Sequence, residues 1–216
     1  MKKRELYDLC SEKLSQAFPE AATELHFSSP YQLLVAVMLS AQCTDKRVNM
    51  VTPALFEAFP TVQDMAAATP EQIFPYVKSV SYPNAKSEHL AQMARMVCDR
   101  FGGEIPQDMD SMTQLPGVGR KTANVMLAVA FGGNAMPVDT HVFRVSHRLG
   151  LVPTTANTPL KVEQALMKYI PDADIPRAHH WLLLHGRYVC TSRAPHCSRC
   201  PLESICPKLL SGSTLP

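Results

Sequence analysis

Four cysteines near the C-terminus have the spacing that most clearly suggests chemistry. They form the pattern C-x6-C-x2-C-x5-C and are Cys190, Cys197, Cys200 and Cys206. The stretch holds little apolar material, so a bound metal that cross-links it would explain how it becomes ordered. Four thiolates suit either one zinc ion or an iron–sulfur cluster, and spacing alone does not choose between them. Disulfides or free thiols are the other interpretation, which we disfavour because we expect no secretion signal.

The cysteine stretch is also locally basic. Its positive residues outnumber the single acidic residue, Glu203, and are Arg187, Arg193, Arg199 and Lys208. A loop held by a metal could present Arg193 to a phosphate group. Alternatively, the positive charge offsets the anionic thiolates.

The segment LPGVGRKTANV, residues 115–125, is a second candidate site. Gly117, Val118 and Gly119 predict a hairpin between two helices, because glycine accepts backbone angles that other residues resist. Successive backbone N–H groups in such a turn, with the start of the next helix and Arg120, can bind one phosphate. An ordinary interhelical turn is the alternative.

Lys121 follows this hairpin at the first turn of a predicted helix, where the helix dipole disfavours positive charge. The lysine could be a phosphate ligand, a solvated charge or a nucleophile. A nucleophilic lysine must be neutral, which near pH 7 costs about 4 kcal/mol. A helix N-terminus supplies only about 0.3–2 kcal/mol. Desolvation in a pocket, with Arg120 nearby, would have to supply the rest.

Asp139 lies in the segment MPVDTHVFRVSHRLG, eighteen positions after Lys121. Asp139 or Thr140 can cap the helix that starts there. The alternative role for Asp139 is a carboxylate that stabilises positive charge on a sugar or accepts a proton. A tight ion pair with Lys121 would keep the lysine charged, so we expect the two to share a pocket without one.

The elements that must position these residues are predicted to be helices. Several prolines follow a serine or threonine that can cap a helix: Ser29–Pro30, Thr69–Pro70 and Thr158–Pro159. Gln72 completes a capping box, and another helix is predicted to begin at Pro176. Two helical apolar stripes are Leu6, Leu9, Cys10, Leu14, Phe18 and Leu90, Met93, Met96, Val97, Phe101.

These patterns predict an all-α protein of about ten helices. The apolar run 33–41 is interpreted as a buried helix in preference to a strand, and it is too short to span a bilayer. Pro53 should break or kink a helix that begins near Thr44. Cys10, Cys43 and Cys98 lie in helical patterns and are expected to be small core residues.

The composition allows the chain to bury a core and excludes a disordered tail. Hydrophobic residues are 46% and charged residues 19% of the 216 residues. The net charge of +2 is too mild to indicate a nucleic-acid partner by itself, so any basic patch must be local. We expect a cytoplasmic protein, of bacterial cytosol or nucleoid type.

Nearly the whole chain resembles the endonuclease III family of DNA glycosylase/AP lyases, within the helix–hairpin–helix glycosylases. The resemblance rests on ELHFSSPYQLLVAVMLSAQCTDKRVN, LPGVGRKTANV, VDTHVFRV, HHWLLLHGRYVC and the four cysteines. It implies two helical domains around a DNA cleft, with a [4Fe–4S] cluster held by the cysteines. The implied domains are 1–21 with the C-terminal helices, 22–133 with the helix–hairpin–helix at about 109–128, and 134–216 with the cluster loop 190–206.

The resemblance also implies an activity. The enzyme would remove oxidised or ring-damaged pyrimidines from double-stranded DNA and nick the strand by β-elimination. Lys121 would attack the sugar, Asp139 would assist, and the protein would act as a monomer without a membrane. The damaged nucleotide would be flipped out of the duplex, and Gln42 would fill the gap that it leaves. Tyr82 stands in VSYPNAKSEHL, where the family commonly has a Gly-Leu-Tyr-like run, and could stack as a wedge or be an ordinary loop aromatic.

Two other functions compete with this one. A monofunctional adenine-mismatch glycosylase shares the hairpin, aspartate and cluster, but it normally has a catalytic glutamate in the first apolar helix. PYQLLVAVMLSAQ has no glutamate. A non-catalytic DNA-binding protein would use the hairpin and the metal loop as clamps, and it would need neither Lys121 nor Asp139.

Overall fold

The computed structural model describes residues 2–209, and all the regular structure among them is helical. The prediction of an all-α protein is confirmed. The chain divides into two compact units, the central unit Glu24–Gly132 and the terminal unit formed by Met1–Thr23 with Gly133–Pro216. The outer ends of two predicted domains, residue 1 and residues 210–216, lie outside the described residues. None of the helices in residues 2–209 combines the length and apolar character needed to cross a bilayer.

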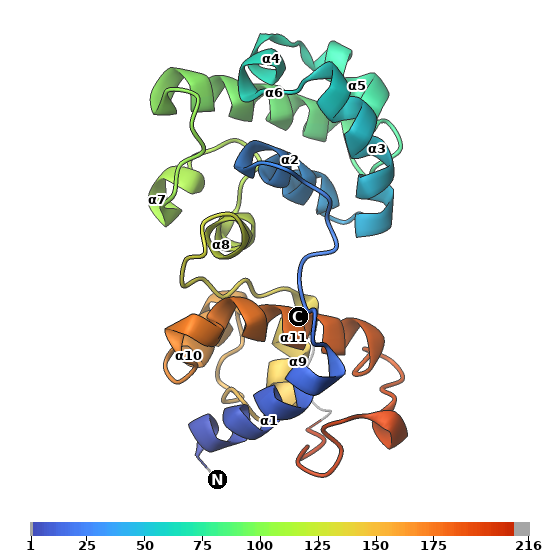
Figure 1. Ribbon diagram of the computed structural model, residues 1–216, viewed down its shortest axis with the longest axis vertical. Coiled ribbons are helices and arrows are strands. Elements are labelled where there is room, and N and C mark those ends of the chain that lie inside the picture. The colour runs from blue at the N-terminus through green and yellow to red at the C-terminus, as the bar shows by residue number, and fades with distance from the viewer. Residues whose placement is uncertain (1, 210–216) are drawn as a thin grey trace. The chain divides into compact units, whose positions relative to one another are not determined.

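The central unit is built around one helix that is apolar on almost every side. The helices of this unit are α2 (Pro30–Ser40), α3 (Asp45–Ala58), α4 (Val62–Ala67), α5 (Pro70–Val77), α6 (Pro83–Phe101), α7 (Met109–Met112) and α8 (Arg120–Val129). Helix α2 contacts α3, α6 and α8, as Figure 1 shows, and α4 and α5 pack on α6. Residues 33–39 of α2 are all buried. The apolar run is therefore a buried helix, as predicted.

Most of the predicted helix starts are confirmed. The side-chain oxygen of Ser29 accepts a hydrogen bond from Gln32 N, and that of Thr158 accepts one from Lys161 N. Thr69 and Gln72 form the predicted capping box. Each of these caps satisfies N–H groups that have no partner inside the helix.

Pro53 does not break its helix, which excludes the first of the two predicted outcomes, a break or a kink. Helix α3 runs without interruption from Asp45 to Ala58, with Thr44 as its N-cap. Proline removes one helical hydrogen bond at a cost of about 3 kcal/mol. Val48, Thr52 and Leu55 are at most 2% exposed, and α3 packs on α2 and α5. Burial of this face offsets the lost hydrogen bond.

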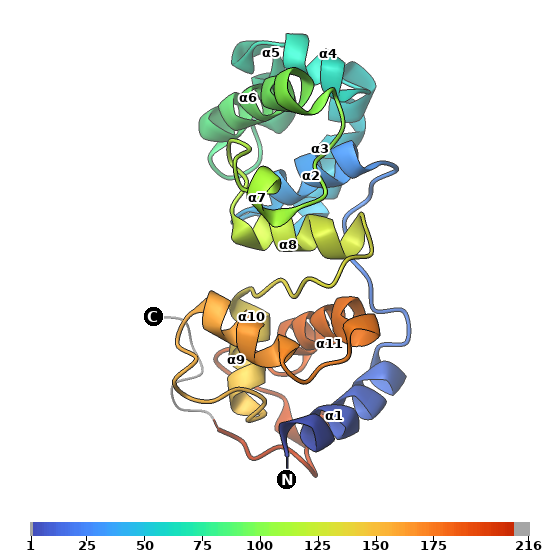
Figure 2. The same ribbon diagram turned by 90° about the vertical axis from the view of Figure 1, so that its left-hand side faces the viewer.

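The terminal unit joins both ends of the chain. Its helices are α1 (Lys3–Ala17), α9 (Thr140–Arg148), α10 (Pro159–Met167), the short 3-10 helix η1 (Asp172–Asp174), α11 (Ile175–Tyr188) and the 3-10 helix η2 (Cys197–Arg199). Helix α11 packs on α9 and on α1, and these elements are visible together in Figure 2. Helix α11 begins at Ile175, one residue before the predicted start.

Helix α1 is held mainly by its buried face. Leu6, Tyr7, Cys10 and Leu14 are each at most 8% exposed, whereas Leu9 is 39% exposed. The predicted stripe was therefore wrong at Leu9, because the buried face is centred on the side of the helix that carries Tyr7.

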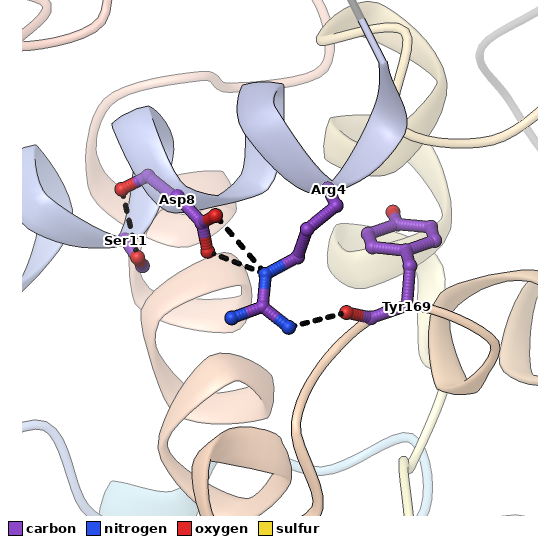
Figure 3. Close-up of polar contacts among 4 residues, drawn as sticks. All are labelled: Arg4, Asp8, Ser11 and Tyr169. Carbon is purple, nitrogen blue, oxygen red and sulfur yellow. Dashed lines mark hydrogen bonds and ion pairs between the residues drawn. The ribbon is translucent and has the colours of Figure 1, made fainter.

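Polar contacts add to this packing of α1, as Figure 3 shows. Arg4 bonds to the Asp8 carboxylate at 2.8 Å and donates to the carbonyl of Tyr169 at 3.3 Å. Arg4 and Asp8 are both exposed, so their ion pair contributes little to stability.

Candidate functional site

The predicted helix–hairpin–helix consists of α7, α8 and the turn between them. Gly117 has a φ of 76°, which favours glycine, whereas Gly119 has an ordinary φ of −91° and is the N-cap of α8. The N–H of Val118 donates to Leu115 O at 3.0 Å and its side chain is buried. Val118 thus helps to hold the turn. The N–H groups of the first turn of α8 have no partner within their own helix, which suits them to an anion.

Gly117 seats the hairpin against two other helices of the central unit. A Cβ at this position would lie 2.9 Å from Cβ of His89 on α6 and 3.0 Å from Cε of Met38 on α2. At Gly119 a Cβ would meet nothing within 4 Å. Packing and backbone conformation therefore require glycine at position 117, whereas neither requires it at position 119.

Replacing Gly117 by alanine is expected to lower the free energy of unfolding by about 1–3 kcal/mol and to weaken binding to duplex DNA. The left-handed backbone and the contact with His89 both oppose the added methyl group. Gly119→Ala is the control for folding, because its backbone and surroundings accept a Cβ. Thermal unfolding and DNA titration measure the two effects. Equal unfolding temperatures for the two variants would contradict this account of Gly117.

Lys121 is the second residue of α8, as the sequence predicted, and both it and Arg120 are exposed. Nothing in the first turn of α8 shields the Lys121 side chain from water. A neutral nucleophile at this position would have to be desolvated by whatever binds over the hairpin. A bound DNA backbone and sugar would supply that desolvation.

Asp139 is the N-cap of α9. Its Oδ1 accepts hydrogen bonds from the backbone N–H groups of His141 and Val142, both at 2.8 Å, and the residue is half-buried. The capping role that the sequence allowed is thus confirmed. The second carboxylate oxygen, Oδ2, takes part in neither of these two bonds. The cap fixes the carboxylate without using all of its acceptor capacity. Lys121 belongs to the central unit and Asp139 to the terminal unit.

Arg144 ties the helix that Asp139 begins to the first cysteine. Its Nη2 donates to Gly186 O on α11 at 2.8 Å, and its Nε donates to Cys190 O at 3.2 Å. Burial, then repulsion by Arg148, lowers the pKa of Arg144. Gly186 permits α11 to approach α9 closely, because a Cβ there would lie 2.8 Å from His141 Cβ. A buried arginine thereby links α9, α11 and the cysteine loop.

All four predicted metal-ligating cysteines line one cavity in the terminal unit. The cavity has a volume of about 30 Å³. Its wall carries the four free thiols of Cys190, Cys197, Cys200 and Cys206. Among residues 2–209 no three His, Cys, Asp or Glu side chains form a ready-made site for a single metal ion. The four predicted ligands nevertheless line the same cavity.

Donors surround the sulfur atoms of this cavity. Arg148 Nη1 lies 3.5 Å from Cys190 Sγ, and the backbone N–H of Lys208 donates to Cys206 Sγ at 3.3 Å. Burial raises the pKa of the Cys200 and Cys206 thiols. A bound metal would favour the thiolate form of these half-buried cysteines, and the donors would then partly offset their negative charge. The donor set fits a metal centre with four thiolate ligands.

His185 closes another side of the same cavity. It is 1% exposed, and its Nε2 lies 3.7 Å from Cys200 Sγ. Burial lowers the pKa of His185 to about 4, so its imidazole is neutral near pH 7. Sequence reasoning gave no role to His185, Arg144 or Arg148. The available signal was that Arg144 and Arg148 are four residues apart on one face of α9, because a charged residue on a buried helix face requires a partner.

The other predicted DNA contacts are exposed. Gln42 and Tyr82 lie in the turns before α3 and α6 of the central unit, and Tyr82 is 65% exposed. Both have positive φ values, 53° and 56°. Arg193 is exposed in the loop between the first two cysteines, where Thr191 donates to Ala194 O at 2.6 Å. Lys208 is paired with Glu203 at 3.2 Å.

Comparison with known proteins adds to this geometry. Residues 35–172 match the family model of the HhH-GPD superfamily base excision DNA repair proteins. Endonuclease III of Bacillus subtilis is 44% identical over 92% of this chain and 90% of its own length. Endonuclease III of Escherichia coli K12 is 42% identical over 90% and 91%. The solved structure of a trapped endonuclease III–DNA covalent intermediate, an estranged-adenine complex, has a TM-score of 0.90 at 41% identity over 96% of this chain and 97% of that one.

Proposed function

The chain belongs to the endonuclease III family, within the HhH-GPD superfamily, and from that membership we infer that it is a bifunctional DNA glycosylase and AP lyase of base excision repair. Its substrate is damaged double-stranded DNA from which it removes oxidised or ring-damaged pyrimidines. It acts as a monomer, and we place it in the cytoplasm at the nucleoid. The observation that carries this function is Lys121 beside the Gly117–Gly119 hairpin, in a chain that superposes on a relative trapped covalently with DNA.

Binding begins at the hairpin. The N–H groups at the start of α8 and the Arg120 side chain hold a backbone phosphate, which fixes the register of the DNA without reading its sequence. The exposed loop that carries Arg193 offers a second contact to the backbone. The damaged nucleotide leaves the stack at a cost of a few kcal/mol, which is smallest for a damaged base. Gln42 and Tyr82 occupy the gap that it leaves.

Lys121 is the nucleophile of the reaction. Its neutral amine attacks C1′ of the sugar, the bond between C1′ and the base breaks, and the base leaves with a proton. Opening of the sugar ring gives a Schiff base between Lys121 Nζ and C1′. Loss of a proton from C2′ then expels the 3′ phosphate, which nicks the strand by β-elimination. Covalent catalysis in this form divides one difficult step into several easier ones.

Asp139 is the carboxylate of the reaction. The positive charge that develops on the sugar as the base departs is stabilised by a nearby anion. The same carboxylate can transfer protons during base loss and ring opening. The bonds from His141 and Val142 hold the carboxylate in place, so these roles need no rearrangement of the cap.

We propose that the cavity of the four cysteines holds a [4Fe–4S] cluster. The cluster, when bound, supplies four iron–sulfur bonds that cross-link the loop. Cys190, Cys197, Cys200 and Cys206 are its ligands, with Arg148 and Lys208 N donating toward the sulfurs. Arg144 carries the resulting order to α9 and hence to Asp139.

The purified protein is expected to contain about four iron and four sulfide ions per chain and to absorb visible light. Cys200→Ser should lower the iron content and the unfolding temperature, because the loop loses a cross-link. Cys98→Ser is the control, since Cys98 is a half-buried cysteine of α6 in the other unit. A colourless protein with one zinc ion per chain would contradict the cluster.

The geometry does not favour the two competing functions. Helix α2, PYQLLVAVMLS, contains no acidic residue that could serve as the catalytic glutamate of an adenine-mismatch glycosylase. A non-catalytic clamp would need neither a lysine at the unfavourable start of α8 nor a carboxylate at the start of α9.

Borohydride trapping on a panel of DNA duplexes tests the proposed function. We expect a covalent adduct with oxidised pyrimidines and with abasic sites, and no adduct with undamaged DNA. If the wild-type protein forms no adduct on any of these duplexes, the lyase activity is disproved. Release of adenine from a mismatch without nicking would instead support the adenine-mismatch glycosylase.

A further inference from the structure

Two turns of the central unit hold a strained backbone at the residues expected to enter the DNA. Gln42 lies between α2 and α3 with a φ of 53°, and Tyr82 lies before α6 with a φ of 56° and a ψ of 51°. A residue other than glycine pays about 1–2 kcal/mol for this left-handed conformation. Tyr82 also precedes Pro83, and a residue before proline favours an extended backbone. Strain of this kind persists only where the surrounding structure enforces it.

Ser81 connects the two turns directly. Its hydroxyl donates to the carbonyl of Gln42 at 2.6 Å, across 39 positions of the sequence. Ser81 stands where the related run commonly has glycine, so this bridge uses a side chain that glycine does not have. The bond holds the backbone of Gln42 against Ser81, which is the residue next to Tyr82.

Lys86 makes a second connection between the same two parts of the central unit. Its Nζ donates to Leu39 O at 2.8 Å and to Ala41 O at 2.7 Å, which are carbonyls at the C-terminal end of α2. The residue is only 8% exposed, and burial lowers its pKa, although the thiol of Cys43 partly opposes that shift. A cation at a helix C-terminus satisfies carbonyls that have no partner in the helix. Lys86 therefore joins the first turn of α6 to the end of α2.

We propose that Ser81 and Lys86 are positioning residues that clamp the Gln42 turn to the Tyr82 turn, so that both side chains enter the duplex as one pre-assembled wedge. This inference rests on the proposed function. Ser81 and Lys86 act through backbone carbonyls and need not touch DNA themselves. A wedge that is ordered before binding loses less conformational freedom when the duplex opens, which favours flipping of the damaged nucleotide.

A double-mutant cycle on Ser81 and Gln42 tests the clamp. Base release in single turnover is measured for wild type, Ser81→Ala, Gln42→Ala and the double variant, on one lesion in duplex DNA. Ser81→Ala should slow release by roughly 3- to 10-fold, the range that one neutral hydrogen bond can support. In the Gln42→Ala background the same change should have a clearly smaller effect, because the clamp no longer holds the Gln42 side chain and positions Tyr82 alone.

Nicking of an abasic site in single-stranded DNA provides the second readout. This substrate has no opposite strand to separate, so Ser81→Ala should cleave it at the wild-type rate. A 2-aminopurine placed opposite the lesion reports opening of the stack and should brighten less with Ser81→Ala. Ser87→Ala is the matched control, since the Ser87 hydroxyl bonds to Pro83 O and Asn84 O within α6. Lys86→Met should repeat the Ser81 pattern with a larger effect.

The clamp is disproved if Ser81→Ala slows duplex and single-stranded substrates equally, or slows release by the same factor with and without the Gln42 side chain. It is also disproved if Ser87→Ala has the same effect as Ser81→Ala. Should Lys86→Met fail to fold, the Ser81 cycle decides alone. A wild-type protein that never releases a base would overturn the proposed function, whereas an active wild type with an additive cycle would overturn only the clamp.

Discussion

Replacing Lys121 by alanine is expected to abolish the borohydride-trapped adduct and to slow strand nicking by roughly 10³-fold or more. In the proposed mechanism the Lys121 amine forms the bond to C1′, and no neighbouring side chain of α8 can replace it. Lys121→Gln should behave in the same way, because glutamine cannot form a Schiff base. It preserves the length of the side chain better than alanine does. Single-turnover kinetics and gel detection of the adduct measure the loss.

Stability separates a lost nucleophile from a damaged fold. Lys121 is exposed at the start of α8, where a positive charge is unfavourable, so its removal should leave the unfolding temperature unchanged or slightly higher. Lys161→Ala is the matched control, because Lys161 is an exposed lysine in the first turn of α10. This control should retain full activity. An adduct that survives Lys121→Ala would show that another amine attacks the sugar.

Asp139→Asn is expected to reduce base release by about 10²- to 10³-fold while the protein stays folded. Asparagine is as good an N-cap as aspartate, so it can still accept the bonds from His141 and Val142. It cannot carry the negative charge proposed to stabilise the cationic sugar as the base departs, and it cannot accept a proton as a carboxylate does. Base release in single turnover and thermal unfolding, measured on the same preparation, give the two effects separately.

Asp139→Ala distinguishes the two roles of this carboxylate. Alanine removes both the cap and the charge, and loss of an N-cap costs about 0.5–2 kcal/mol of stability. Asp139→Ala should therefore unfold at a lower temperature than Asp139→Asn, although both variants lose base release to a similar extent. If Asp139→Asn were fully active, Asp139 would be a helix cap and nothing more.

Features that depend on neighbouring residues could be predicted from the sequence. The caps at Ser29, Thr69 and Thr158 bond to N–H groups three residues away, so the residue types alone identify them. At the start of α9 the sequence offered Asp139 or Thr140 as the cap, and the structure shows Asp139. The hairpin before Lys121 is likewise set by glycines within five consecutive residues.

Prediction failed where packing with other helices outweighed a local preference. Pro53 has a strong tendency to end a helix, but α3 continues because its buried face packs on α2 and α5. Leu9 fits a helical stripe, yet the fold places it outside the buried face of α1. Neither outcome is encoded within the segment itself.

By itself, then, the sequence determined the all-α class, the helix starts, the hairpin with Lys121 and the set of four cysteines. Only the tertiary structure decided which distant groups meet. The Ser81 hydroxyl reaches Gln42 O, and Lys86 reaches carbonyls 45 and 47 positions away. Such contacts leave no periodic pattern, because they depend on how two helices approach and on which rotamers the packing allows. The structure therefore supplied the supports behind the candidate groups that the sequence had already suggested.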